Sequence, residues 1–371
     1  MDKQKVLVGM SGGVDSSAVC MLLIEQGYEV VGVTMRMRDT ERCFVKYSQE
    51  DPDYIIEARK LAEKLKFPHY VLDLRDEFKQ EIVDYFAHEY LSGRTPNPCV
   101  RCNQIFKWPK LIQLADELGC QFVATGHYAN IEKRENACYI HRGKDSMKDQ
   151  SYFLWNVDPT TWQRAIFPLG TKEKEEVKSY AANKGFVSIS TQKESMEICF
   201  VQDDYRDFLR KYYPAEVAAI EQGHFVDPAG LKLGLHEGYP FYTIGQRKGL
   251  RIALGEPAYV LKINPVKNTV MLGNRDQLQA TEMVVENYRI VSPDDFKNRV
   301  QTQIRYRSKG VFSQVTIINE EFLYIQFDEP VSAITPGQSA VFYEDDRLLG
   351  GGIIAGEKAL KKVKKLLRKE M

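Results

Sequence analysis

The chain has 371 residues, of which 43% are hydrophobic and 27% charged, a composition typical of globular proteins rather than disordered or fibrous ones. Its 51 basic and 51 acidic residues cancel, which argues against a protein that coats nucleic acid indiscriminately but permits a local basic patch. No apolar run approaches the roughly 20 residues of a membrane span, and no signal peptide precedes the first apolar segment. Seven scattered cysteines do not suggest a disulfide framework. We therefore expect a cytoplasmic protein of two or three domains with no membrane association.

Residues 1–212 alternate apolar runs with helical patterns, which predicts a parallel α/β sheet. We expect helices at 51–66, 76–92 and 104–119, and strands at 5–10, 29–35, 69–74 and 121–126. Ligands of such sheets bind beyond the carboxyl ends of the strands. The loop after the first strand, Met35, residues 126–127 and the loop 93–103 should therefore share one edge.

The loop that follows the first strand reads Ser11-Gly12-Gly13-Val14-Asp15-Ser16-Ser17. Two glycines allow a close backbone approach to a phosphate, and the helix that begins here offers unpaired N–H groups at its positive dipole end. The lysine of a Walker A loop is absent, which favours release of pyrophosphate and transfer of AMP. The alternative is an ordinary Gly-Gly turn with a serine cap.

A second loop, residues 94–103, contains two prolines and the pair Cys99-x-x-Cys102. We expect Cys102 at or just before a helix N-terminus, with Asn103 as the cap and Arg101 adjacent, an environment that stabilises a thiolate. The alternatives are half of a structural zinc site or an idle thiol pair, but no second Cys-x-x-Cys follows. Cys199, taken alone, is more typical of a small buried hydrophobic residue.

From Gly223 onward short alternating runs predict antiparallel β structure in two parts. The expected strands include 224–226, 241–244, 258–263, 269–272, 315–318, 322–327 and 339–343. The implied domains are 1–212, 213–278 and 279–356. The remainder, 357–371, carries seven basic residues against two glutamates, and we interpret it as a solvated amphipathic helix rather than an arm that binds nucleic acid.

Ten segments together resemble the tRNA-specific 2-thiouridylases, a family within the PP-loop ATP pyrophosphatases. They are MSGGVDSS at 10–17, GRTPNP at 93–98, CN at 102–103, ATGHY at 124–128, KDQSYFL at 148–154, ICF at 198–200, GQRKGL at 245–250, FDEP at 327–330, TPGQSA at 335–340 and GGGII at 350–354. The resemblance implies an α/β PP-loop domain of the adenine nucleotide α-hydrolase type, a small β-rich central domain and a C-terminal β-barrel that binds tRNA.

The implied reaction adenylates the C2 oxygen of the wobble uridine of a tRNA with ATP and Mg²⁺, and then replaces that oxygen with sulfur. By the same resemblance, ATP is held by Gly9, Met10, Ser11, Gly12, Gly13, Val14, Asp15, Ser16, Met35 and Gly126. An adenylated oxygen is a good leaving group, and a thiolate delivers sulfur well, so the chemistry is coherent.

The resemblance also assigns sulfur transfer and tRNA recognition. Cys199 receives sulfur as a persulfide from a sulfur-relay carrier protein, and Cys102 is the nucleophile that completes the transfer. Asn97, Pro98 and Cys99 surround the flipped base. The remaining tRNA contacts fall on His127, Lys148, Asp149, Gln150, Arg305, Tyr306 and Gln338.

Several of these residues also have simpler interpretations. Arg305, Arg307 and Lys309 can form the solvated face of a strand, residues 148–150 a polar turn, and His127 a structural histidine. Two other functions also remain open: a PP-loop ligase or amidotransferase that acts on a small molecule, and a non-catalytic RNA-binding protein that senses ATP.

Position 99 departs from the family pattern, because better-known members carry aspartate where this chain has Cys99. Three cysteines, Cys99, Cys102 and Cys199, could hold a [4Fe–4S] cluster whose open iron binds free sulfide. The competing hypothesis makes Cys99 a bystander or a resolving thiol beside a Cys102–Cys199 pair.

Overall fold

The computed structural model describes residues 3–39, 50–134, 137–186, 198–201, 204–253 and 255–370. The chain forms two compact units. The first comprises residues 1–83, 99–200 and 346–348, and the second comprises residues 84–98, 201–345 and 349–371.

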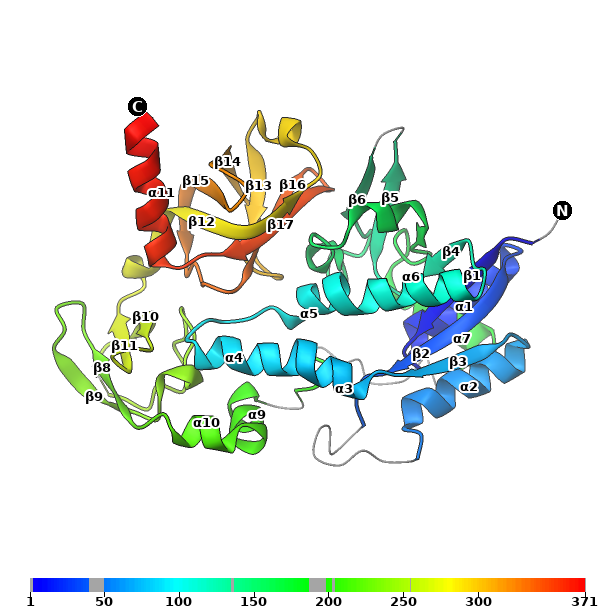
Figure 1. Ribbon diagram of the computed structural model, residues 1–371, viewed down its shortest axis with the longest axis horizontal. Helices are drawn as coiled ribbons and strands as arrows, with labels where there is room; N and C mark the ends of the chain where they lie inside the picture. The colour runs from blue at the N-terminus through cyan, green and yellow to red at the C-terminus, as the bar shows by residue number, and fades with distance from the viewer. Residues whose placement is uncertain are drawn as a thin grey trace. The chain divides into compact units, whose positions relative to one another are not determined.

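The first unit is built on a parallel sheet of strand order β3-β2-β1-β4-β7 (Figure 1). Its strands are β1 (Lys5–Met10), β2 (Glu29–Arg36), β3 (His69–Asp73), β4 (Phe122–Ala124) and β7 (Ala165–Ile166). Lys5 pairs with Glu29 and Val6 with Phe122, both in parallel register. The expected strands at 5–10, 29–35, 69–74 and 121–126 are thus confirmed, with ends that differ by one or two residues.

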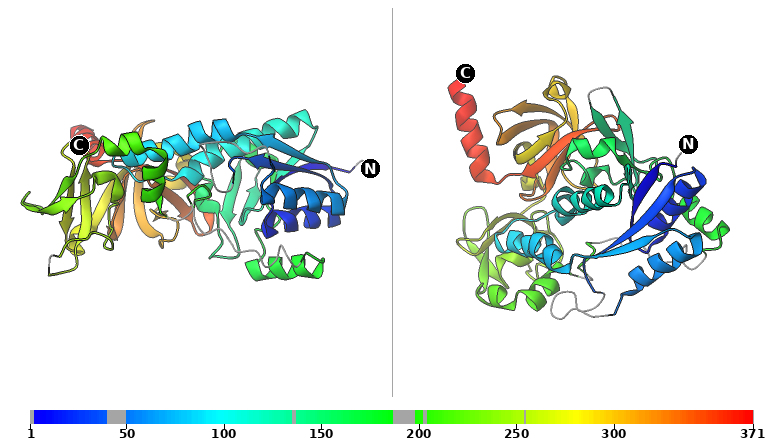
Figure 2. Two further views of the ribbon diagram at one scale, coloured as in Figure 1. Left: turned by 90° about the horizontal axis from the view of Figure 1, so that it is seen from below. Right: turned by 45° about the vertical axis from the view of Figure 1, so that its right-hand side comes forward.

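Helices cover both faces of this sheet, as the alternation of side chains along β1 shows. Val6 and Val8 pack in one cluster with Ala18 of α1 (Val14–Glu25), Leu61 of α2 (Asp53–Leu65) and Val177 of α7 (Lys174–Asn183). Gly9 faces the other way, toward Leu111 of α6 (Trp108–Glu117). Successive strand residues point to opposite faces, so α6 covers the face opposite α1. Figure 2 shows α1 and α2 in blue beside the blue strands.

The first unit also contains an antiparallel hairpin of β5 (Ala129–Lys133) and β6 (Cys138–Arg142). Between them, the two units contain several further helical segments. These are α3 (Arg75–Phe78), η1 (Lys79–Asp84), α4 (Tyr85–Leu91), α5 (Pro98–Arg101), η2 (Cys102–Lys107), η3 (Ser151–Phe153) and η4 (Pro159–Gln163). The helix expected at 104–119 begins earlier, at Pro98, because proline fits the first turn of a helix, where no N–H donor is needed.

The second unit contains a small sheet of order β10-β11-β8-β9. Its strands are β8 (Gly223–Val226), β9 (Lys232–His236), β10 (Tyr259–Asn264) and β11 (Thr269–Gly273). The strand expected at 241–244 is wrong: η5 (Tyr239–Phe241) forms a helical turn there, since Pro240 cannot donate to a strand ladder. Helices α9 (Tyr205–Tyr212) and α10 (Pro214–Ala218) precede this sheet.

The second unit ends in a closed barrel of order β12-β15-β14-β13-β16-β17, with β12 pairing again with β17. Its strands are β12 (Gln279–Ile290), β13 (Val300–Gln303), β14 (Val311–Ile317), β15 (Phe322–Ser332), β16 (Ser339–Glu344) and β17 (Arg347–Ile354), with the turns η6 (Asp276–Leu278) and η7 (Pro293–Phe296). Val285, Ile325 and Phe342 are fully buried in its interior. The predicted C-terminal barrel is confirmed.

The last helix, α11 (Glu357–Glu370), follows β17 (Figure 1). Val363 is fully buried in a cluster with Val284 and Phe322 on the outside of the barrel. The expected amphipathic helix is confirmed, but it is packed on the barrel rather than free in solvent. In the described residues, no helix is long and apolar enough to cross a membrane.

Candidate nucleotide and sulfur-transfer site

The carboxyl ends of β1, β2 and β4 meet at one edge of the parallel sheet. β1 ends at Met10 and α1 begins at Val14, which gives the expected strand, turn and helix. Met35 lies near the end of β2, and Gly126 follows β4. The residues predicted to hold the nucleotide therefore share the edge where ligands of such sheets bind.

The glycines of the loop are required by its geometry. Gly12 has φ of +72°, and a Cβ there would lie 2.2 Å from the Tyr54 carbonyl oxygen. Gly13 is the extended N-cap residue of α1, and no side chain caps this helix. The serine cap of the simpler interpretation is therefore absent from the described structure. The uncapped N-terminus of α1 is suited to an anion.

Ser16 stabilises the loop from inside. Its hydroxyl accepts a hydrogen bond from the Ser11 N–H (3.1 Å) and donates one to the Gly13 carbonyl (3.2 Å). Ser17 Oγ also donates to the Gly13 carbonyl (2.9 Å). These bonds hold the turn open around its backbone N–H groups.

Asp15 makes a half-buried ion pair that the sequence did not reveal. Lys174 Nζ lies 2.7 Å from each carboxylate oxygen of Asp15, and the Tyr128 hydroxyl donates to Oδ1 at 2.8 Å. Lys174 is only 7% exposed. A Cβ at Gly126 would lie 3.1 Å from Asp15 Cβ, so a larger residue there would crowd the pair.

Lys174 is the first residue of α7, where Glu173 and Glu176 form a capping box. That box fixes where the helix starts, and hence where Lys174 points. Tyr128 belongs to the segment ATGHY, but no role was predicted for it. Nothing local in the sequence marks Lys174 as a partner of Asp15, because 159 residues separate them.

The three candidate cysteines all belong to the first unit, and none is in a disulfide. Cys99 lies in α5, Cys102 begins η2, and Cys199 is exposed. Burial, followed by Cys199 and Cys102, raises the pKa of the Cys99 thiol to about 12. Burial also raises the pKa of Cys102 to about 11, with Cys199 adding to the shift and Lys107 opposing it. Phe200 and Phe106 both pack on Phe78, with ring centroids 5.8 and 5.5 Å away, so the segment next to Cys199 and the helical run with Cys102 lie side by side.

The expectation of a stabilised thiolate at Cys102 is therefore wrong for this state of the protein. The helical run starts at Pro98, so Cys102 lies one turn inside it. Arg101 turns away and pairs with Glu81, with Nη2 3.0 Å from Oε2. Asn103 is buried and donates to the Phe153 carbonyl (3.2 Å) instead of capping the helix. Lys107 is the cation that opposes the rise in the Cys102 pKa, but burial outweighs it.

The described residues contain no group of three or more His, Cys, Asp or Glu side chains that could hold a metal ion. The three cysteines, as they are arranged, do not fit the ligand set of an iron–sulfur cluster.

Three of the predicted tRNA contacts have structural roles in the first unit. His127 is buried, lies 2.7 Å from Thr125 Oγ1 through Nδ1 and stacks on Trp108. Burial holds its pKa well below the ordinary value. Asp149 accepts hydrogen bonds from the Ser151 N–H and hydroxyl, and Gln150 Oε1 accepts from the Tyr128 N–H.

In the second unit, Arg305 and Tyr306 lie in a turn between β13 and β14, not on a strand as predicted. Gln303 Nε2 donates to both of their carbonyls (3.1 and 2.6 Å). The Ser308 hydroxyl donates to the Arg305 carbonyl (2.9 Å) and accepts from the Arg305 N–H. These polar groups satisfy the backbone locally, which ends the strand. Arg305 and Arg307 are exposed.

Gln338 anchors the segment that leads to the cysteine loop. Its Nε2 donates to the carbonyls of Thr95 (3.1 Å) and Pro96 (2.9 Å), and the Thr95 N–H donates to the Pro336 carbonyl. Asn97 and Pro98 follow directly in the chain. The side chain predicted to contact tRNA thus stabilises the loop in this structure.

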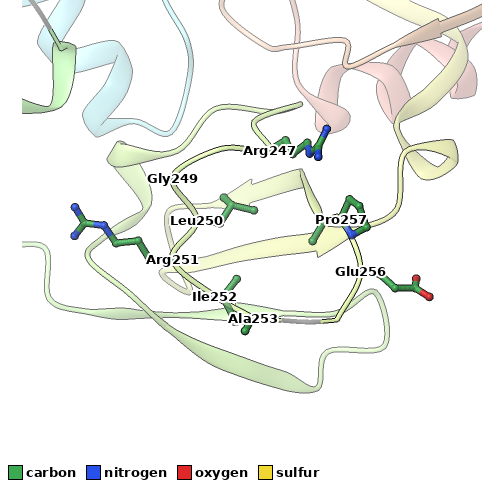
Figure 3. A pocket seen from close by; sticks show the side chains of 9 residues that line it. Arg247, Gly249, Leu250, Arg251, Ile252, Ala253, Glu256 and Pro257 are labelled. Carbon is green, nitrogen blue, oxygen red and sulfur yellow. The ribbon is translucent and has the colours of Figure 1, made fainter.

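A shallow cavity of 480 Å³ lies within the second unit, lined by residues of the segment 247–258 (Figure 3). Arg251 and Glu256 point to opposite sides of the segment. Arg251 pairs with Glu237 (2.7 Å). The charged groups that line the cavity do not converge on one point, so nothing in the lining indicates a site for a charged ligand.

Three family models together match most of the chain, from residue 4 to residue 354. Residues 4–203 match the family model described as tRNA methyl transferase HUP domain. Residues 206–274 match the tRNA methyl transferase PRC-barrel domain, and residues 280–354 match the aminomethyltransferase β-barrel domain.

Two curated relatives are similar over nearly their full length. The tRNA-specific 2-thiouridylase MnmA 3 of Phocaeicola vulgatus is 52% identical, covering 97% of this chain and 96% of the relative. The tRNA-specific 2-thiouridylase MnmA of Cytophaga hutchinsonii is 43% identical, covering 95% and 97%. A 4-thiouridine synthetase–RNA complex with bound ATP matches 53% of this chain and 45% of its own, with 18% identity and a TM-score of 0.37. On the extent and identity of these curated matches, the chain belongs to the family of tRNA-specific 2-thiouridylases.

Proposed function

We propose that this protein adenylates the C2 oxygen of the wobble uridine of a tRNA with ATP and then replaces that oxygen with sulfur. One observation carries the proposal: the phosphate-sized loop and the helical run that contains Cys99 and Cys102 adjoin the same parallel sheet. The helical run that starts at Pro98 and contains Cys102 leads through α6 into β4. This run ends at the start of β4, which lies at the amino edge of the sheet. Because a crossover helix runs opposite to the strands, the run itself begins at the carboxyl edge, where the Ser11 loop also lies.

Activation is proposed to begin with ATP at residues 9–16, with Met35 and Gly126 beside it. The loop has no Walker lysine, so its backbone N–H groups and the start of α1 would bind the β- and γ-phosphates that leave as pyrophosphate. Mg²⁺ would arrive with the ATP phosphates, since it keeps most of its water and binds few protein ligands. The role of the Lys174 contact is to hold Asp15 in place beside Gly126.

Sulfur transfer is proposed for Cys199 and Cys102. The exposure of Cys199 suits the receipt of a sulfur atom as a persulfide from a sulfur-carrier protein. Cys102 would attack the Cys199 sulfur, form a disulfide and release hydrosulfide, which displaces AMP from C2. Two external thiols must then reduce this disulfide, and are themselves oxidised to a disulfide, before the next cycle. Cys102 must first lose its proton, and Lys107 is the group that favours this.

The tRNA is proposed to bind with its wobble base extruded toward Asn97, Pro98 and Cys99. In the second unit, the exposed guanidinium groups of Arg305 and Arg307 suit phosphate contacts. We also propose that Tyr306 and Lys148 contact the tRNA. His127, Asp149, Gln150 and Gln338 would instead stabilise the protein backbone near their own positions. The domain division at residues 212, 278 and 356 also stays a proposal.

The proposal is tested by incubating the protein with ATP, unfractionated tRNA and a persulfide donor. We expect AMP, pyrophosphate and thiolated uridine, identified by chromatography and mass spectrometry. Cys102→Ser and Cys199→Ser should abolish thiolation, whereas Cys138→Ala, a matched control in β6, should not. Release of ADP, or addition of nitrogen to a small molecule, would contradict the proposal. Binding of ATP without AMP formation would instead indicate a sensor.

The cysteine at position 99 and the sulfur donor are tested separately. Cys99→Ala should retain thiolation with a persulfide donor if Cys102 and Cys199 suffice. Iron and acid-labile sulfide are measured after anaerobic reconstitution. A stoichiometric iron content that is lost in Cys99→Ala, together with activity on free sulfide alone, would favour the three-cysteine cluster over the persulfide route.

A further inference from the structure

Five cations of helix α11 lie on one exposed face. Lys358, Lys361, Lys362, Lys365 and Arg368 are all exposed. Their spacings of three, one, three and three residues keep them on one side of a helix with 3.6 residues per turn. The opposite side carries Leu360, Val363 and Leu367.

The apolar side of α11 is occupied by the barrel. Val363 is fully buried among Val284 and Phe322, and Leu360 and Leu367 pack against the same cluster. At the start of the helix, the Ala355 N–H donates to the Val284 carbonyl (2.9 Å). The helix is therefore fixed in rotation, and its cationic face is held outward before any partner arrives.

Acidic residues of the second unit neutralise only part of this charge. Lys364 is bound by Glu282, Lys362 pairs with Glu321 at 3.0 Å, and Lys361 pairs with Glu357 at 2.6 Å. Among the described residues, Lys358, Lys365 and Arg368 form no ion pair. The three unpaired cations lie along one line of the helix, at intervals of seven and three residues.

We propose that the exposed face of α11 binds the phosphate backbone of the tRNA substrate as a second contact, independent of the loop that holds the wobble base. The inference rests on the proposed function, which supplies the polyanion. A row of unpaired cations on a rigid helix is suited to successive phosphates and carries no base specificity. The matched barrel model ends at residue 354, so the helix lies beyond it.

The burial of the apolar side argues against a lipid surface as the partner. A helix that lies in a membrane interface inserts its apolar face among the acyl chains. In α11 that face is already packed on β12 and β15, and inserting it would require the helix to leave the barrel. The unpaired cations lie on the exposed side of the helix, where they suit a soluble polyanion.

The test compares the full-length wild type with a triple variant, Lys358→Gln, Lys365→Gln and Arg368→Gln, whose substitutions break no ion pair in the described residues. The matched control is Lys3→Gln, Lys66→Gln and Lys267→Gln, which removes three exposed cations elsewhere and gives the same net charge. Binding of unfractionated tRNA is measured by fluorescence anisotropy from 50 to 300 mM salt. Circular dichroism verifies that both variants retain the wild-type fold.

We expect the α11 variant to bind tRNA about tenfold more weakly near 150 mM salt, and its salt slope to fall by about 0.7–0.9 for each phosphate that is no longer neutralised. The control should change neither quantity beyond the small effect of net charge. A variant with Lys358→Arg and Lys365→Arg should keep the wild-type affinity, since charge and not shape is at issue. The ATP affinity should be unchanged in all variants.

Equal tRNA affinity and salt slope in the α11 variant and the control would overturn the inference. Loss of binding to anionic phosphatidylserine vesicles, with tRNA binding intact, would also overturn it and would assign the face to lipid. If the wild type forms AMP and thiolated uridine while the α11 variant binds tRNA normally, only this inference fails. If the wild type forms neither product, the proposed function fails first.

Discussion

Asp15 and the cations of α11 differ in whether their charges are paired and in how far they are exposed. In the first unit, both Asp15 carboxylate oxygens are bound by Lys174, whose side chain is 8% exposed. In the second unit, the cations of α11 are exposed, and three of them form no ion pair among the described residues. A carboxylate paired with a buried lysine is held in one geometry, as chemistry on ATP requires, whereas exposed unpaired charges bind a mobile polyanion reversibly.

The largest effect is expected when the Asp15–Lys174 pair is broken. Asp15→Asn should lower the rate of AMP formation by roughly 100-fold or more, because the site loses a fixed charge. Lys174→Met should destabilise the first unit by about 1–3 kcal/mol, less than for a fully buried pair because Asp15 is partly exposed. Steady-state kinetics and urea unfolding measure the two quantities.

The double variant Asp15→Asn/Lys174→Met sharpens this test. It should be more stable than the sum of the single changes implies, since neither charge is left unpaired. Lys178→Met removes a more exposed cation from the same helix and should cost under about 0.5 kcal/mol. Additive effects of the two single changes would show that the pair is not coupled.

An effect of about tenfold is expected at the turn between β13 and β14. Replacing Arg305 and Arg307 by Gln should weaken tRNA binding and lower the salt slope by about 0.7–0.9 for each phosphate that the two side chains neutralise. ATP affinity should not change. Lys3→Gln with Lys66→Gln removes the same charge and is the control. An unchanged salt slope would place the tRNA platform elsewhere.

Gln338 should behave as a structural residue in the barrel rather than as an exposed contact. Gln338→Met removes the donor to the Thr95 and Pro96 carbonyls and should destabilise the second unit by about 1–2 kcal/mol in urea unfolding. Gln314→Met, at a half-buried site in β14, should have a smaller effect. A loss of tRNA affinity with wild-type stability would instead support direct contact.

The smallest effect concerns pH. Folding lowers the pKa of His127, so the folded state resists its protonation and the unfolded state does not. Stability from this group is therefore present above about pH 6.5 and is lost as pH falls below it, at up to about 1.4 kcal/mol per unit. His127→Gln should flatten unfolding free energy between pH 6.5 and 5.5. An unchanged slope would contradict the prediction.

Much of the first unit follows from local sequence. Strands such as β1 are short apolar runs, and the Gly12-Gly13 pair requires a turn at a known place. The state of Cys102 could not be predicted in this way. Arg101 was expected to stabilise a thiolate, but it bonds to Glu81, twenty residues away, and burial then raises the thiol pKa. Arg101 is next to Cys102 in the sequence, but its guanidinium group bonds elsewhere.

The second unit shows the same limit. The alternation of Arg305, Arg307 and Lys309 predicted a strand, but the side chains of Gln303 and Ser308 capture the backbone and form a turn. The hydrophobic periodicity of a sequence gives little sign that side chains will compete in this way for backbone hydrogen bonds. The helix at 357–371 was correctly predicted from its pattern, whereas its docking on Val284 and Phe322 was not.

By itself, the sequence determined the order of strands and helices, the phosphate-sized loop at Ser11 and the family to which the chain belongs. These depend on backbone preferences of neighbouring residues and on motifs that can be read along the chain. The tertiary structure alone decided that Lys174 binds Asp15 and that Gln338 holds Thr95, across 159 and 243 residues. Such partners are chosen by burial and topology, because a charge or amide removed from water bonds to whatever group the fold brings within reach.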